Sequence, residues 1–209
     1  KEYEEWGTGE GMLKWVKCFD CGQGFHGAVK LVLGWASWKT YLGRPEADMY
    51  RSTALVCLGK AFRPSQPEEA LQVFETYLAL FRRRWPQAKE VITMAQSDLA
   101  CCLNEVGRHD EAVVLMRRIY ARRVAMHGAA HEDTISSGQC LAVSLNTIEL
   151  WSEAKTLTRD QLLPAAESLL GADSYLTLMR KHNLVQALAQ DPACTREDLL
   201  EAETIMQDV

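Results

Sequence analysis

The stretch NEVGRHDEA, residues 104–112, returns as NTIELWSEA at residues 146–154, and this recurrence decides the fold. The Asn, the Glu and the final Ala of the second stretch each lie 42 residues after their counterparts in the first. An interval of a few tens of residues is typical of repeat proteins, in which each repeat is one small unit of packed secondary structure. We therefore predict that the chain is built from internal repeats.

The same interval links landmarks over most of the chain. A Leu followed by Gly, Ala or Val marks one place four times, at residues 58, 99, 141 and 184. Around each landmark apolar residues recur at the spacing of one helix face, and a second run with this spacing follows. Short joints separate the runs, at residues 64–67, 107–110 and 151–153, with Gly107 placed to end a helix and Asp110 to cap the next. Each unit is therefore predicted to be a pair of antiparallel helices.

The stacking of these helix pairs explains why the sequence pattern repeats. One pair alone leaves too much apolar surface in water, whereas successive pairs at a constant spacing bury a continuous core. Ala112 and Ala154 occupy the predicted crossing, where a small side chain lets two helices approach closely. Gly128 and Gly171 are placed to end the second helix of their units. Since no stretch alternates as a strand would, the predicted fold class is all-α, an α-solenoid of about four repeats over residues 50–209.

The composition is that of an ordinary globular protein. Of the 209 residues, 47% are hydrophobic and 24% charged, which supports a buried core and argues against disorder. Twenty-three basic and 28 acidic residues give a formal charge of −5, whereas a general nucleic-acid binder usually carries a basic excess. The seven cysteines do not have the spacing of a disulfide framework, so we expect reduced thiols in an intracellular, cytoplasmic protein.

The most apolar stretch lies before the repeats, at residues 27–42. Because Lys30 and Lys39 interrupt it and it is shorter than the roughly 20 residues of a spanning helix, no membrane span is predicted. With Trp35 and Trp38 it is expected to form a helix that covers the open end of the repeats, so residues 1–49 are interpreted as a capping segment. The sequence begins at Lys1 rather than Met, and an upstream targeting segment would therefore not be visible.

The landmarks resemble the pattern of tetratricopeptide repeats. Leu99-Ala100, Leu103 and Ala112 fit this pattern, as do their counterparts 42 residues later. The period exceeds the ~34 residues of the standard form, and Gly128, His131 and Thr134 before the next helix resemble the kinesin-light-chain variety. The N-terminal segment together with the repeats also resembles a set of uncharacterised algal tetratricopeptide proteins. Repeat one departs from the pattern by a shortened joint, and repeat four by the insert AQDPACTRE.

This resemblance implies a binding groove lined by the first helix of each unit. Carried over position by position, it places mainly uncharged hydrogen-bonding side chains there. Asn104 and Asn146 are the leading candidates, because an amide both donates and accepts hydrogen bonds and can hold a peptide backbone. The alternative is that each Asn simply ends its helix before a turn. The candidate partner-binding residues are Lys60, Arg63, Ser97, Cys101, Asn104, Gln139, Val143, Asn146, His182 and Gln186. No cluster of Lys and Asn matches the clamp by which some family members hold a terminal carboxylate.

Cys18, Cys21 and His26 have a metal-like spacing. A structural zinc site requires four ligands, and no second pair follows at a similar spacing. Two interpretations stay open, one half of a zinc site or a turn with two structural thiols, and no other cofactor is expected. His127 and His131 are four residues apart, but the intervening Gly128 favours a loop that His131 orients over a metal site.

The arginines and the catalytic residue types form no motif of their own. Arginines at residues 82–84, 117, 118, 122 and 123 favour a solvated outer face, with a ridge for an acidic protein or RNA as the alternative. Nothing gathers a nucleophile, a base and an orienting group, so no catalytic residues are predicted and the chain is not expected to be an enzyme.

The sequence thus predicts a non-catalytic scaffold that binds a protein or peptide in the groove. Two alternatives stay open. One is a zinc-containing adaptor or RNA-associated module, and the other is a structural subunit of a larger complex, bound through its convex face.

Overall fold

The computed structural model describes residues 10–18 and 20–207, so part of the predicted capping segment lies outside the described residues. The chain divides into two compact units, Lys1–Gly107 and Arg108–Val209. Within the described ranges every named element is a helix, and the strand-like pairing there is a single antiparallel bridge between Lys17 and Gly24. The predicted all-α class is therefore confirmed. No described helix combines the length and apolar character needed to cross a membrane.

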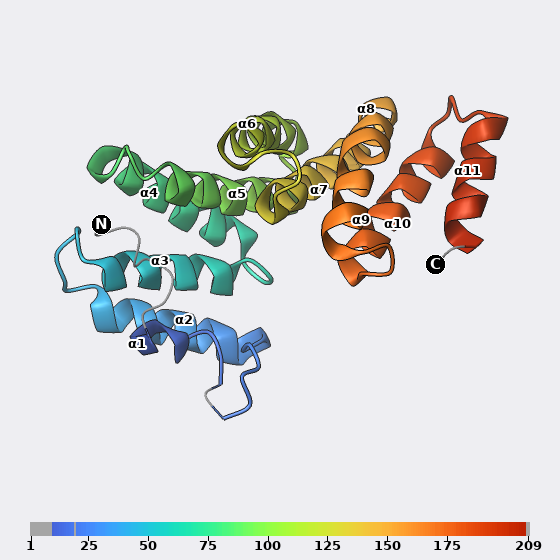
Figure 1. Ribbon diagram of the computed structural model, residues 1–209. Helices are drawn as coiled ribbons and strands as arrows, with labels where there is room; N and C mark the ends of the chain where they lie inside the picture. Colours follow the sequence, from blue (N-terminus) through green and yellow to red (C-terminus); the bar gives the residue numbers. More distant parts are fainter. Residues whose placement is uncertain (1–9, 19, 208–209) are drawn as a thin grey trace. The chain divides into compact units, whose positions relative to one another are not determined.

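From α2 to α5, unit 1 is a succession of helices, each packed on the next (Figure 1). α2 contacts α3, α3 contacts α4, and α4 contacts α5, while the short α1 lies against α3. Repeat one is the pair α3 and α4, and α5 is the first helix of repeat two. The bounds are α1 Glu10–Leu13, α2 Gly27–Tyr41, α3 Met49–Phe62, α4 Pro67–Arg84 and α5 Lys89–Glu105.

Unit 2 contains the rest of the repeats. α6 contacts α7, α7 contacts α8, and α10 contacts both α7 and α11. In repeat three the second helix consists of α8, the π-helical turn η1 and α9 in direct succession. The bounds are α6 His109–His127, α7 Glu132–Thr147, α8 Trp151–Leu157, η1 Thr158–Leu162, α9 Leu163–Leu170, α10 Tyr175–Gln190 and α11 Arg196–Gln207.

The helix ends follow local sequence chemistry. Gly128 and Gly171 directly follow α6 and α9 with φ of 85° and 87°, so both predicted helix-ending glycines are confirmed. At α11 the Asp198 N–H donates to Thr195 Oγ1 and the Thr195 N–H donates to Asp198 Oδ2, both at 3.1 Å. This reciprocal pair is a capping box.

Two predicted joints are wrong by a few residues. α6 begins at His109 with Arg108 as its N-cap, so Asp110 lies in the first helical turn and is not the capping residue. A carboxylate there still stabilises the positive end of the helix dipole. Trp151, predicted to lie in a joint, is instead the first residue of α8. A lone acidic or aromatic residue near a helix start does not specify which residue begins the helix.

Small residues bring the helices together. Ala112 and Ala154, the predicted crossing residues, are 0% and 1% exposed. In unit 1, a Cβ at Gly59 would lie 2.8 Å from the ring of Phe74, which is itself fully buried. These positions have no room for a larger side chain, because protein interiors are packed at crystal-like density.

The predicted helix before the repeats is present as α2. It packs on α3, where the Trp35 ring meets Phe62 edge-on with centroids 5.6 Å apart. Trp38 contacts two groups of buried side chains, one around Tyr77 and Phe81 and the other around Tyr41. α2 therefore covers apolar surface of repeat one, as a capping helix would.

The π turn η1 coincides with one extra residue in repeat three. The crossing Ala and the helix-ending Gly are 16 residues apart in repeat two, Ala112 to Gly128, and 17 apart in repeat three, Ala154 to Gly171. A π turn holds one residue more than an α turn. The added residue is thus accommodated within the helix, and buried Ala154 and Ala166 on either side of η1 keep their place in the core.

Candidate functional site

In unit 1 the predicted groove cations are bound by carboxylates of the following first helix. Lys60, near the end of α3, has its Nζ 3.6 Å from Asp98 Oδ2 on α5. Arg63 directly follows α3 and forms a bidentate pair with Glu105: Nη2 lies 2.8 Å from Oε1, and Nε lies 3.2 Å from both carboxylate oxygens. Both cations therefore link α3 to α5.

The electrostatics of these pairs reduce the charge offered to a ligand. Burial raises the pKa of Asp98 above its ordinary value. The positive charges of Lys60 and Arg63 offset only part of this increase. The hydrogen bond with Glu105 raises the pKa of Arg63, because it stabilises the charged guanidinium. Each cation of this face is thus balanced by a neighbouring acid.

The other predicted residues of unit 1 lie on α5. Ser97 is half-buried and its Oγ donates to the Thr93 carbonyl at 3.0 Å. Cys101 and Asn104 are half-buried. The Asn104 backbone carbonyl accepts the Gly107 N–H at 3.1 Å in the last turn of α5.

In unit 2 the predicted residues include an exposed set on α7 and α10, which are in contact with each other. Val143 on α7 is 45% exposed, and His182 and Gln186 are exposed one turn apart on α10. Gln139 lies one turn before Val143; its Oε1 and Nε2 are both buried, and neither has a hydrogen-bond partner within the described part of the chain. We call these four residues the α7–α10 face.

Asn146 is placed differently from its neighbours. It is 6% exposed, and its Nδ2 donates to the Asn183 carbonyl of α10 at 3.4 Å. Its Oδ1 and the Nδ2 of Asn183 are buried without a partner among the described residues. Asn146 therefore contributes to the contact between the two first helices of unit 2.

Some exposed or charged residues of these helices are absent from the sequence prediction. Met179 and Tyr175 on α10, 39% and 74% exposed, precede His182 by three and seven residues and share its side of the helix. The repeat itself marks Met179, which follows Ser136 by 43 residues as Ser136 follows Met94 by 42. Asp98 and Glu105 carry no comparable signal, because their partners lie on another helix.

The three residues with metal-like spacing do not come together as one group of ligands. In the part of the chain that the structure describes, the ligand atoms of Cys18, Cys21 and His26 do not form a group within 4.8 Å of one another. His26 is instead the N-cap of α2 and makes no side-chain capping hydrogen bond.

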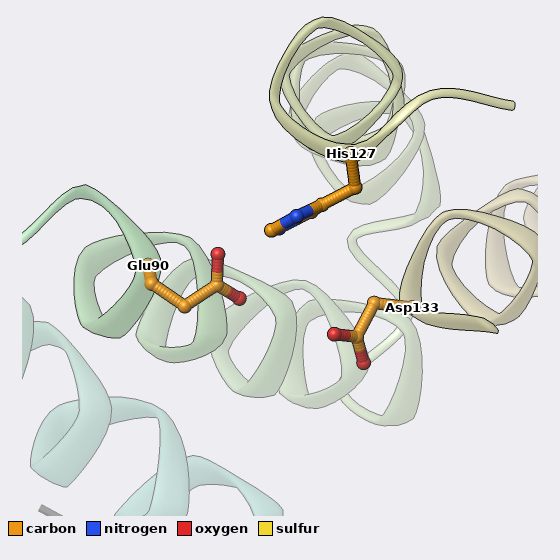
Figure 2. Close-up of side chains that lie close together, drawn as sticks. All are labelled: Glu90, His127 and Asp133. Atoms are coloured by element: carbon orange, nitrogen blue, oxygen red, sulfur yellow. The ribbon is translucent and has the colours of Figure 1, made fainter. Parts of the chain in front are cut away.

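The His127 and His131 pair orients the connection between α6 and α7. The two rings stack with centroids 4.5 Å apart. His131 is the N-cap of α7, and its Nδ1 accepts the Asp133 N–H at 3.2 Å. Figure 2 shows His127 at the end of α6 and Asp133 in the first turn of α7. The predicted loop-orienting role of His131 is confirmed.

The arginines divide between exposed positions and helix-to-helix pairs. Arg82, Arg84 and Arg118 are exposed. Arg117 pairs with Glu153, whose carboxylate lies 2.5 Å from its Nη2. Arg123 is 7% exposed, and its Nη1 donates to the Asp133 carbonyl at 2.8 Å. Arg123 is therefore a structural residue of unit 2 and not part of an outer ridge.

The path of the backbone is similar to that of solved helical repeats. A structure described as TPR-like repeats of a putative kinesin light chain from Podosopora anserina matches with a TM-score of 0.64 at 21% identity, over 86% of this chain and 85% of that one. A variant of that protein with one substitution gives 0.68 at 20% identity, over 86% and 82%. The fold is that of tetratricopeptide-like repeats. BtubC (BKLC) from P. vanneervenii gives 0.66 at 15% identity, over 86% and 73%.

The tetratricopeptide-like fold accounts for the helix pairs and for the long period that the sequence shows. No protein-family model and no curated protein matches the sequence. At these levels of identity the likeness concerns the fold.

Proposed function

We propose that the chain is a non-catalytic scaffold that binds a peptide or protein segment on the first helices of its tetratricopeptide-like repeats. The observation that carries this proposal is the α7–α10 face: Val143, His182 and Gln186 are exposed on two first helices that contact each other, and the Gln139 amide, one turn before Val143, has no hydrogen-bond partner among the described residues. A buried amide without partners is costly, so rotation of the Gln139 side chain toward a bound peptide backbone, which offers both a donor and an acceptor, would be favourable.

The chemistry of the α7–α10 face favours an uncharged segment of the ligand. Val143 and the adjoining Met179 offer apolar contact, while Gln139 and Gln186 offer amide groups. No Asp, Glu, Lys or Arg belongs to the face as defined, in contrast to the paired charges between α3 and α5. Peptide backbone contacts would supply affinity, and apolar contact with Val143 would supply selectivity.

A matched pair of valines tests this proposal. Val143 on α7 is 45% exposed and Val114 on α6 is 47% exposed, within the same unit. Peptides would be selected from a displayed random library on the wild-type chain, and their affinities measured for Val143→Glu and Val114→Glu. We expect Val143→Glu to weaken binding at least about tenfold, because it buries a charge against an uncharged ligand.

The control variant separates this face from the second helices. Val114→Glu should leave the affinity within about twofold, and both variants should keep the helical circular dichroism of the wild type. If Val114→Glu abolishes binding while Val143→Glu does not, the ligand binds the α6 side, and the proposal is overturned in favour of a subunit held through its convex face.

A further inference from the structure

α10 carries a buried guanidinium that no acid neutralises. Among the described residues three basic side chains are buried, Arg123, Arg180 and Lys181, at 7%, 3% and 9% exposed. Arg123 pairs with Asp133, whose Oδ1 lies 3.4 Å from its Nη1. Arg180 and Lys181 form no ion pair within the described part of the chain. Because a buried charge without a counterion is strongly destabilising, Arg180 calls for a ligand that could balance it.

The hydrogen bonds of Arg180 leave part of its guanidinium unsatisfied. Nη1 donates to the Leu176 carbonyl, one turn earlier on α10. Nε is buried and has no partner among the described residues. Burial lowers the pKa of Arg180, because it disfavours the charged form. The rest of the chain, as far as it is described, thus offers this donor no acceptor.

The guanidinium lies where α10 meets α7. The Asn146 amide of α7 donates to a carbonyl of α10 that is 37 residues later in the sequence. By the same interval Leu176, whose carbonyl binds Arg180, lies about level with Gln139, because consecutive first helices run in the same direction. Cys140, the next residue of α7, is within electrostatic reach of Arg180. The cationic group is therefore placed between the two first helices of unit 2.

Amide donors from both helices accompany the guanidinium. Gln139 Nε2 on α7 and Asn183 Nδ2 on α10, three residues after Arg180, are buried without a partner among the described residues. α10 contains no Asp or Glu, and the two acids of α7, Glu132 and Asp133, lie exposed in its first turn. Buried donors that lack acceptors around a positive charge favour an anionic ligand.

We propose that the contact between α7 and α10 binds a tetrahedral oxyanion of the phosphate class, with the Arg180 guanidinium as its principal ligand. Arginine binds such oxyanions through its fixed fork of N–H donors. A phosphate has four oxygens and can accept from the guanidinium and from amides of both helices at once, whereas a carboxylate has two oxygens in one plane. Lys181, the adjoining buried cation, adds positive charge that favours a dianion.

The oxyanion site borders the α7–α10 face. Met179 and His182, on either side of Arg180 and Lys181 in the sequence, are exposed, so an ion reaches the guanidinium by a short movement of side chains. The oxyanion requires Arg180, whereas the uncharged peptide of the proposed function requires Val143. Each of the two proposals can therefore fail without the other.

Isothermal titration calorimetry of the full chain with inorganic phosphate, at an ionic strength held constant by chloride, tests for the site. The wild type should bind phosphate saturably. Arg180→Met should bind it at least about tenfold more weakly, since Met keeps an apolar stem and removes the donors. The matched control is Arg118→Met, at an exposed arginine of α6, which should leave the affinity within about twofold.

Thermal unfolding separates this site from the general effect of phosphate. Phosphate is excluded from protein surfaces and raises the Tm of folded proteins without a specific site. The saturable part of the rise, about 5–10 °C at about a hundredfold excess over Kd, should be lost in Arg180→Met. In phosphate-free buffer this variant should melt at or above the temperature of the wild type, because it removes an unpaired buried charge.

Methyl phosphate and acetate distinguish the sources of the anion. Weaker binding of methyl phosphate than of inorganic phosphate assigns the site to the free ion, and tighter binding assigns it to the phosphate group of a larger ligand. Acetate should bind at least about tenfold more weakly than phosphate, and equal binding of acetate would contradict a tetrahedral site. Absence of saturable phosphate binding to the wild type, or equal affinity in Arg180→Met, would overturn the proposal.

Discussion

At the scale of single residues, Gly34 sets how closely α2 approaches α3. A Cβ at this position would lie 2.7 Å from the Ala61 Cβ and 3.4 Å from backbone atoms of Cys57 and Leu58. None of these atoms can rotate away. Gly34→Ala should therefore separate the helices and lower the free energy of unfolding by about 1–3 kcal/mol, measured by chemical denaturation.

The control for this prediction is Gly43→Ala, in the turn after α2. A Cβ at Gly43 meets nothing within 4 Å, so this variant should change the free energy of unfolding by no more than about 0.5 kcal/mol. Equal destabilisation by the two substitutions would show that loss of glycine, and not the close approach of α2 to α3, is responsible.

A second prediction at this scale concerns the carboxylate of Asp198. The backbone N–H of Thr195, its hydroxyl, Arg159 and Lys155 lower the pKa of Asp198 from 3.8 to about 2. Because the folded-state pKa is the lower one, charged Asp198 stabilises unit 2 above about pH 4, and this stabilisation is lost as the pH falls toward about 2. Asp198→Asn should cost about 1–2 kcal/mol at neutral pH and little at pH 2.

Denaturation curves recorded over this pH range measure the effect. Asp160→Asn is a suitable comparison, since Asp160 is exposed in the π turn and should contribute little at either pH. A cost for Asp198→Asn that does not change between neutral pH and pH 2 would contradict the electrostatic explanation and indicate lost capping geometry alone.

At the scale of elements, the π turn η1 predicts an unusual tolerance to shortening. Deletion of one residue from an α-helix rotates everything beyond it by about 100°. Deletion of exposed Asp160 should instead convert η1 into an ordinary α turn and leave Ala154 and Ala166 in the core. The shortened chain should keep its helical content and melt cooperatively.

The matched deletion removes Arg118 from α6, six residues after Ala112 as Asp160 is six residues after Ala154. Arg118 is exposed as well, but α6 has no π turn to absorb the loss, so buried Ile119 would rotate out of the core. This variant should lose several kcal/mol or fail to fold. Similar thermal unfolding of the two deletion variants would contradict the interpretation of η1 as an absorbed residue.

Elements are also the scale at which the sequence predicts most. The helix-ending glycines Gly128 and Gly171 and the helix predicted at residues 27–42 depend on interactions within a few residues. A single sequence shows interactions of this kind. The assignments that need a neighbouring helix are harder. The burial of Asn146 against α10 and the pairing of Arg63 with Glu105 depend on how first helices pack, a property that no local pattern contains.

At the scale of the whole molecule, the two compact units predict that folding can be divided. Unit 2 has fully buried side chains contributed by α6, α7, η1 and α10, among them Met116, Ile135, Leu162 and Leu184. Since repeat proteins are stabilised by contacts between neighbours in the sequence, a fragment of residues 108–209 should be helical and unfold cooperatively. Circular dichroism during thermal unfolding checks this, and a fragment without a cooperative transition would contradict it.

The π turn of repeat three also bears on how such a chain can change over evolutionary time. The residue after the landmark Leu recurs after 41, 42 and 43 residues, at Gly59, Ala100, Ala142 and Val185. A residue gained inside a helix need not be expelled into a loop, so the period can drift while the buried positions keep their place in space. A sequence pattern of fixed length then no longer matches the repeats after a few units, whereas the backbone path of each repeat stays similar to that of the others. Descent can thus erase the sequence likeness between repeats of one chain long before it erases their shared fold.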